Sequence, residues 1–190
     1  MFYKFNFIDE TNKDMVRCFV GVMLPKYLKD NIVKIQQLIN YLPIDGKLVE
    51  KENLHICLSF LGEVEDEKLG ILYENLDRLC LKHGSLSVQV SGIKLIPSEK
   101  YVRVIVLNCF SKELESLGKD IEKEVGGDAK PPHITLCRVR KIRDKNQTIE
   151  KIKEIKSNVG ELEISGIEVI KSHLVRTGPI YNVLHESKLL

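Results

Sequence analysis

Two short segments of the sequence carry a histidine followed, two residues later, by a small polar side chain. His55 precedes Cys57 within residues 53–61, and His133 precedes Thr135 within residues 131–140. An imidazole can transfer a proton near neutral pH, and a hydroxyl on the same face can help it to bind an oxyanion. A lone His-x-Thr segment is usually a solvated or structural feature, whereas two copies in matching contexts predict a pair of imidazoles that converge on one site.

Polar and apolar residues alternate in both segments, which predicts two strands that each bury one face. The side chains that should face the shared site are His55, Cys57, Ser59, His133, Thr135 and Cys137. The side chains that should face the core are Ile56, Leu58, Phe60, Ile134, Leu136 and, after a shift near the end of the second strand, Val139. Hydroxyl and thiol groups are therefore expected beside both imidazoles.

The composition is that of an ordinary soluble domain. The chain has 190 residues, of which 43% are hydrophobic, enough to build one core or two joined lobes. Its formal net charge of +2 excludes a global field that attracts polyanions. Residues 138–145, however, hold five cations against the single carboxylate of Asp144, a local net charge of +4. Such a run is usually a solvated loop, but its position after His133 makes phosphate binding the alternative.

The cysteines and the absence of targeting signals indicate a cellular compartment. The five cysteines are odd in number and scattered, with no Cys-x-x-Cys pair. No signal peptide or apolar run long enough to span a membrane is present. These features predict a reducing, cytoplasmic setting without a membrane partner. Residues 1–14 fit none of the patterns that follow, and we expect them to be an N-terminal extension.

The remaining periodicity predicts an α+β fold. Strands are expected at residues 16–23, 86–96, 101–109, 162–171, 172–175 and 180–184, and helices near residues 25–39, 69–80, 114–125 and 149–155. Residues 43–46 are typical of a turn, and Gly62 should end the His55 strand. There are too few helices per strand for a doubly wound parallel sheet, and no glycine-rich phosphate loop occurs. We expect two similar halves, each with one histidine strand and outer helices, around a central cleft.

In this order, the segments resemble the two-histidine phosphoesterases, specifically the RNA 2′,3′-cyclic phosphodiesterases once called 2′-5′ RNA ligases. The resemblance covers roughly residues 15–185 and is carried by residues 17–25, 52–64, 91–93, 97–98, 132–139, 171–174 and 178–181. It implies a single bilobal domain over residues 15–190, with two pseudo-symmetric lobes of largely antiparallel sheet. It also implies a His-x-Thr or His-x-Ser motif in each lobe.

The resemblance implies a function as well. Members of this family open the 2′,3′-cyclic phosphate ends of RNA to 2′-phosphates without a metal or other cofactor, and they join certain tRNA halves weakly and reversibly. By this resemblance His55 and His133 are the catalytic pair, and RNA with cyclic phosphate ends, including tRNA halves, is the partner. No obligate protein partner follows from it.

The other site residues have expected roles in holding the substrate. Thr135 and Cys57 should hold the non-bridging oxygens of the phosphate, and Arg138 should stabilise the charge that develops on it. Cys57 departs from the family, which has Thr or Ser there, and a thiol is a weak hydrogen-bond donor. The phosphate should therefore lose about 1 kcal/mol of one contact. Phe19 is a candidate stacking partner for the base, although a Phe in such a strand is more often part of the core.

Two alternatives use the same residues differently. His55, Cys57, His133 and Cys137 form a possible zinc ligand set, although a His-x-Cys pair on a strand chelates poorly. The chain could also be an RNA-end-binding protein with weakened catalysis, in which Cys57 marks the loss. Binding alone, however, does not need paired imidazoles. His83, His173 and His185 are expected to be structural or solvated.

Overall fold

The two histidine-bearing segments are the central strands of a ten-stranded sheet in the computed structural model, which describes residues 14–176 and 178–190. His55 begins β3 (His55–Glu65), and His133 begins β7 (His133–Ile142). The two strands pair at one position, Ile56 with Ile134. This narrow junction divides the sheet into two lobes, with a histidine strand at the inner edge of each.

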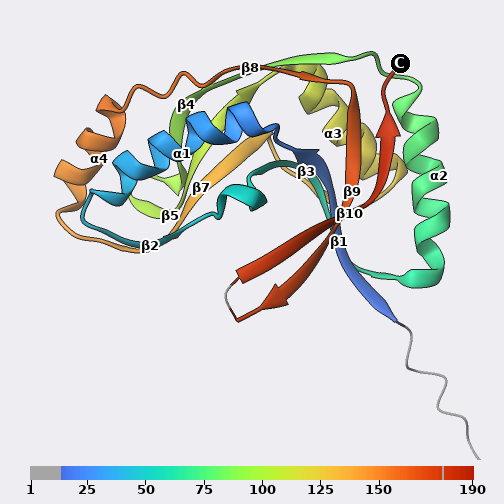
Figure 1. The fold of residues 1–190 in the computed structure, drawn as a ribbon, viewed down its shortest axis with the longest axis horizontal. Coiled ribbons are helices and arrows are strands. Elements are labelled where there is room, and N and C mark those ends of the chain that lie inside the picture. The colour runs from blue at the N-terminus through green and yellow to red at the C-terminus, as the bar shows by residue number, and fades with distance from the viewer. Residues whose placement is uncertain (1–13, 177) are drawn as a thin grey trace, which may run out of the picture.

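In each lobe, further antiparallel strands lie outward from the histidine strand within the sheet (Figure 1). The first lobe adds to β3 the strands β1 (Met15–Met23), β9 (Gly166–Val175), β10 (Gly178–Lys188) and the short β6 (Asp128–Ala129). The second lobe adds to β7 the strands β5 (Tyr101–Phe110), β4 (Leu86–Ser98), β8 (Gly160–Ile164) and β2 (Ile44–Leu48). All strand pairs in the described part of the chain are antiparallel. The predicted α+β architecture is confirmed, with one continuous sheet in place of two separate ones.

Across the two described ranges, 14–176 and 178–190, four helices cover the outer faces of the two lobes. They are α1 (Lys26–Asn40), α2 (Leu69–Cys80), α3 (Lys112–Glu124) and α4 (Lys145–Glu154), and the 3₁₀ turns η1 (Lys51–Asn53) and η2 (Asp66–Lys68) precede β3 and α2. In α1 the buried positions Leu28, Ile32, Ile35 and Ile39 recur every three or four residues, as a helix with 3.6 residues per turn requires. α1 and α4 lie at one end of the molecule, and α2 and α3 lie at the other (Figure 1).

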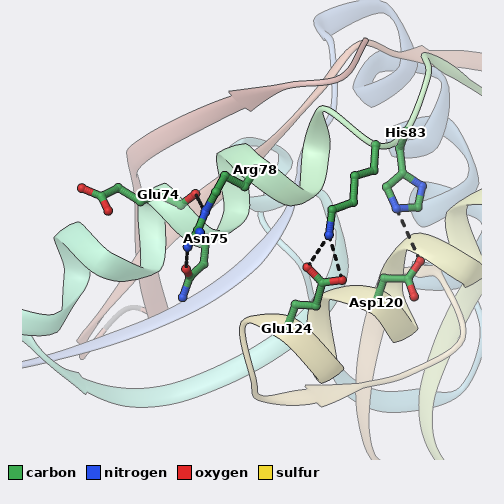
Figure 2. Close-up of polar contacts among 7 residues, drawn as sticks. Glu74, Asn75, Arg78, His83, Asp120 and Glu124 are labelled. Carbon is green, nitrogen blue, oxygen red and sulfur yellow. Dashed lines mark hydrogen bonds and ion pairs between the residues drawn. The ribbon is translucent and has the colours of Figure 1, made fainter.

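Charged side chains join α2 to its neighbours. Just beyond the end of α2, Lys82 Nζ lies 2.9 Å from the Glu124 carboxylate, and His83 Nε2 lies 3.4 Å from the Asp120 carboxylate. Figure 2 shows His83 pointing toward Asp120. On the other side of α2, the His185 ring lies 2.8 Å from the carboxylate of Asp77. His83 and His185 thus contact carboxylates on neighbouring elements, in keeping with the expected structural or solvated role.

Two local predictions are wrong and one short strand was missed, because strand pairing overrides turn propensity. The segment predicted as a turn at residues 43–46 mostly belongs to β2, which pairs with β7, and β6 was not predicted at all. Gly62 does not end β3: it has a φ of +75° beside a bulge, and the strand continues to Glu65. A glycine can adopt this φ without strain, so the residue bends the strand rather than stopping it.

Two further predictions concern the ends of the chain and membranes. Apart from Asp14, the predicted extension at residues 1–14 lies outside the described residues. The Asp14 carbonyl accepts a hydrogen bond from Asp66 N at 2.9 Å. Within residues 14–176 and 178–190, none of the helices has the length and hydropathy needed to cross a bilayer.

Candidate active site

A β-bulge in β7 determines which of its side chains reach the cleft. Ile105 and Val106 are consecutive in β5, yet they pair with Cys137 and Thr135, which leaves Leu136 as the extra residue. Leu136 and Cys137 are therefore both buried, and Arg138 turns to the same side as Thr135. The prediction that Cys137 faces the site is wrong, because the shift expected near Val139 already occurs at Leu136.

β3 has a bulge at the equivalent position. Its extra residue is Leu58, and the consecutive side chains of Leu58 and Ser59 are both buried. Phe60 consequently turns into the cleft with 41% of its surface exposed, so the predicted faces of Ser59 and Phe60 are exchanged. The residue after each bulge's buried pair thus enters the cleft: Phe60 in one lobe and Arg138 in the other.

Both bulges are held by polar contacts that the sequence did not reveal. The Leu136 carbonyl accepts hydrogen bonds from Val49 N at 3.0 Å and from the buried Gln36 side chain at 2.9 Å. In β3, the Ser59 hydroxyl donates to the Gly126 carbonyl at 2.8 Å. A Cβ at Gly127 (φ +94°) would lie 2.4 Å from that hydroxyl, so a glycine is needed where the chain crosses β3 toward β6.

The two histidine strands form the floor of a cleft of about 920 Å³. β1, β3, β6 and the β9–β10 hairpin line it from the first lobe, and β4, β5 and β7 line it from the second. The lining includes the six residues with a predicted catalytic or substrate-binding role: Phe19, His55, Cys57, His133, Thr135 and Arg138. The structure therefore brings them together in one concave site.

The two imidazoles are oriented in the same way. His55 Nδ1 lies 2.7 Å from the Asn53 carbonyl, and His133 Nδ1 lies 2.8 Å from the Pro131 carbonyl. A carbonyl oxygen can only accept a hydrogen bond, so each Nδ1 carries the proton of the neutral ring. Each histidine therefore has Nε2 available for chemistry in the cleft.

His55 packs with two aromatic rings that also contact each other, with 5.2 Å between the Phe19 and Tyr181 centroids. The ring centroids of Phe19 and Tyr181 lie 4.7 and 5.1 Å from that of His55. Burial lowers the pKa of His55, and the positive charges of Arg138, His133 and Lys29 lower it further, while the hydrogen bond to Asn53 opposes the shift. The neutral imidazole is thus the favoured form of His55 at pH 7.

Cys57 and Thr135 occupy equivalent positions, one residue before each bulge. Burial, with the nearby Asp128 carboxylate, raises the pKa of the Cys57 thiol to about 11. The thiol therefore stays protonated near pH 7 and is a poor nucleophile. Both side chains line the cleft, so a weak donor and a strong donor are available to a bound anion.

The cleft is more cationic than the chain as a whole. Its lining includes four basic side chains, Arg17, Lys94, Lys130 and Arg138, and the one carboxylate of Asp128. From the basic run at residues 138–145, only Arg138 enters the cleft. Arg140 lies 2.6 Å from the Asp45 carboxylate, and Lys145 Nζ contacts the Lys100 carbonyl instead. Arg140 and Lys145 of that run therefore make their contacts outside the site.

The proposed zinc ligand set does not come together. Three of its members, His55, Cys57 and His133, line the cleft, but Cys137 is 3% exposed on the core side of β7. Among the residues that the structure describes, no cluster of three or more potential ligands is present. The β7 bulge is the physical reason, because it moves Cys137 to the core face.

Sequence reasoning missed several residues of the site. Tyr181 belongs to a segment that carried the family resemblance, but nothing in the strand pattern showed that it packs on His55. Phe60 was assigned to the core, and Arg17 lies 5.2 Å above the Phe60 ring. Asn108 pairs with His133 across β5 and β7, and donates to the Gly92 carbonyl at 3.1 Å. Only the pairing of distant strands reveals these contacts.

Comparison with known proteins identifies the family of the chain. The family model described as LigT like Phosphoesterase matches residues 22–106 and 108–181. The RNA 2′,3′-cyclic phosphodiesterase of Methanocaldococcus jannaschii is 35% identical over 178 residues, covering 90% of this chain and 99% of that protein. The protein of the same name from Methanothermobacter thermautotrophicus is 31% identical, covering 92% and 99%.

Solved structures share the fold. A crystal structure of a Thermus thermophilus protein superposes with a TM-score of 0.76 at 23% identity, covering 91% of this chain and 97% of that one. E. coli LigT in complex with 3′-AMP gives a TM-score of 0.74 at 22% identity, covering 93% and 99%. The family match spans both histidine strands and both lobes, and with the curated relatives it shows that the chain belongs to the LigT-like phosphoesterase family.

Proposed function

We propose that this protein hydrolyses the 2′,3′-cyclic phosphate ends of RNA to 2′-phosphates. The observation that carries the proposal is the matched pair of histidines. Each donates Nδ1–H to the carbonyl two residues earlier, so each presents Nε2 to one cationic cleft. The curated relatives named RNA 2′,3′-cyclic phosphodiesterase support the same reaction.

The reaction needs one base and one acid. The base takes a proton from water as its oxygen forms a bond to phosphorus, and the acid donates a proton to the 3′-oxygen as the P–O3′ bond breaks. We assign the base to His55, because its lowered pKa favours the neutral ring. The acid is then His133 in its protonated form. The phosphate remains on the 2′-oxygen, and the two histidines exchange protonation states.

Three side chains are proposed to hold the phosphate. Thr135 and Cys57 lie on either side of the β3–β7 junction and contact the non-bridging oxygens. Arg138, turned into the cleft by the bulge, stabilises the charge that builds up on the phosphorane. Cys57 acts here as a protonated donor and not as a nucleophile.

The terminal nucleoside lies against the aromatic part of the cleft. Phe19 is only 3% exposed and packs on His55, so we assign it a supporting role under the imidazole. Phe60 is the more exposed ring and carries the Arg17 guanidinium above it, which makes it a better platform for a base.

Two extensions follow from the same chemistry. A 5′-hydroxyl in place of water would give a 2′-5′ linkage, so we expect weak ligation of RNA fragments such as tRNA halves in addition to hydrolysis. All five cysteines are free thiols, which fits the reducing cytoplasm where we place the protein.

The test uses a short oligoribonucleotide with a 2′,3′-cyclic phosphate end. We expect conversion to the 2′-phosphate, identified by ³¹P NMR, at the same rate with and without EDTA. Loss of turnover in EDTA with recovery on zinc addition would indicate a metal enzyme. Tight binding of the cyclic end without turnover would favour an RNA-end-binding protein.

A further inference from the structure

The β9–β10 hairpin extends beyond the sheet as an arm over the cleft. β1 pairs with β9 only up to Lys171, so residues 172–175 pair with β10 alone. This arm, residues 172–176 and 178–181, projects from the body of the molecule in Figure 1. The side chains on one of its faces, Ser172, Leu174, Pro179 and Tyr181, line the cleft. A two-stranded hairpin has little stability of its own, so contacts with the body must hold the arm in place.

One buried side chain makes such a contact. Asn53 is 8% exposed, and its amide nitrogen donates to the Pro179 carbonyl at 2.8 Å. The same nitrogen lies 3.5 Å from a carboxylate oxygen of Glu50. Both partners are acceptors, so the nitrogen and not the oxygen of the amide must face them.

The turn of the arm also packs closely on the segment before η1. A Cβ at Gly178 (φ +146°) would lie 2.7 Å from Lys47 Nζ and 3.0 Å from Glu50 Oε1. The Asn53 hydrogen bond therefore belongs to a packed contact between the arm and residues 47–53.

Asn53 also orients the catalytic histidine through its main chain. Its carbonyl accepts the hydrogen bond from His55 Nδ1 at 2.7 Å, while its side chain holds the strand that carries Tyr181, whose ring packs on His55. In the other lobe the equivalent carbonyl belongs to Pro131, which has no side-chain donor, and proline rings restrict the backbone there. The first lobe thus links its histidine to an arm that projects from the sheet, and the second lobe holds its histidine by a stiff segment.

We propose that Asn53 is a positioning residue that couples the arm to His55. The Asn53 side chain holds the strand whose Tyr181 ring makes an edge-on contact with His55, and the Asn53 carbonyl accepts the hydrogen bond from His55 Nδ1. The catalytic consequence of this coupling rests on the proposed function, but the coupling itself does not.

The surroundings of His55 give the coupling a measurable signal. Arg138 and His133 face it from β7, Lys29 from α1, and the Tyr181 ring from the arm. Burial is the largest cause of its lowered pKa. Release of the arm exposes the ring to water, so the pKa of His55 should rise toward its ordinary value.

The test compares Asn53→Ala and Asn53→Asp with Gln89→Ala. The aspartate matches asparagine in shape but cannot donate to Pro179, and it places a second carboxylate beside Glu50. The control removes another side-chain amide bond to a main-chain carbonyl, Gln89 to Gly160 at 3.1 Å, remote from the cleft. In both Asn53 variants we expect the His55 resonance to titrate at higher pH, with kcat lowered about 10- to 100-fold because the base is misplaced. Gln89→Ala should match wild type in both measurements.

Wild-type titration of His55 in folded Asn53→Ala would overturn the proposal. The NMR titration needs no substrate, so its outcome is independent of whether the enzyme hydrolyses cyclic phosphates. If the Asn53 variants do not fold, Gly178→Ala is the second variant. Its added methyl group clashes with Lys47 and Glu50 and so displaces the arm while Asn53 stays intact. An unchanged His55 titration in that variant would also overturn the coupling.

Discussion

The two lobes hold the same short segment in different surroundings. In the first lobe, His55 forms a cluster with the rings of Phe19 and Tyr181, and burial lowers its pKa. In the second lobe, His133 follows two prolines and pairs with Asn108 of the neighbouring strand β5. A difference in environment decides which imidazole of such a pair is favoured as the neutral base and which as the protonated acid. The difference between the lobes is therefore part of the mechanism, and each prediction below tests one element of it.

Removal of either imidazole should have the largest effect. We expect His55→Ala and His133→Ala to lower kcat by roughly 10²- to 10⁴-fold, because each removes one proton transfer from the transition state. Steady-state kinetics on a cyclic-phosphate oligonucleotide measures the change, and circular dichroism checks the fold. His83→Ala, whose ring pairs with Asp120 outside the cleft, is the matched control and should retain wild-type kcat. A folded His133→Ala protein with near-normal turnover would contradict the assignment.

Loss of Arg138, which the β7 bulge turns into the cleft, should have the next largest effect. Arg138→Ala should lower kcat/KM about 10²-fold, because a cation aimed at the developing phosphorane charge is lost. Arg138→Lys should recover only part of this, because an ammonium group lacks the planar fork of guanidinium. Arg140→Ala is the control from the same strand, since Arg140 pairs with Asp45 outside the cleft. Equal losses of kcat/KM in the Arg138 and Arg140 variants would show that general surface charge, and not the placement of Arg138 in the cleft by the bulge, causes the loss.

Exchange of the donors before the bulges should have the smallest effect. Cys57→Thr should keep or raise kcat/KM, and Thr135→Cys should lower it about fivefold, the equivalent of about 1 kcal/mol for one hydrogen bond. Cys57→Ala should lose little, because a thiol donates weakly. The pKa of Cys57, raised to about 11, also predicts slow alkylation at pH 7. Abolished turnover in both Cys57 variants, with rapid inactivation by a thiol reagent, would instead make Cys57 a nucleophile.

The sequence predicted the elements well where periodicity alone determines them. The buried positions of α1 repeat at helical spacing, and both histidine strands were identified by their alternation. β2 was missed because Asp45 and Gly46 favour a turn in isolation, whereas pairing with β7 extends them. Propensity describes the isolated segment, and the partner strand decides the outcome.

The alternation of side chains predicted the faces of the site strands correctly up to the bulges and not beyond them, and Arg138, beyond the β7 bulge, was predicted from the family resemblance and its place three residues after Thr135. His55, Cys57, His133 and Thr135 precede the extra residues, so alternation assigned them to the correct face. One added residue then reversed the faces of Ser59, Phe60 and Cys137. Nothing in the local residue types at Leu58 or Leu136 marks a bulge, because the extra residue is defined by the register of the neighbouring strand.

The most direct test of the division of labour between the lobes is the pH dependence of the two histidine variants. In the wild type, kcat/KM should be bell-shaped and should fall on the acid side as pH drops through the lowered pKa of His55, because protonation removes the base. We predict that the residual activity of His55→Ala lacks this acid limb, and that the residual activity of His133→Ala lacks the alkaline limb. The opposite pattern, with the acid limb retained in His55→Ala and lost in His133→Ala, would contradict the assignment of base and acid to the two lobes.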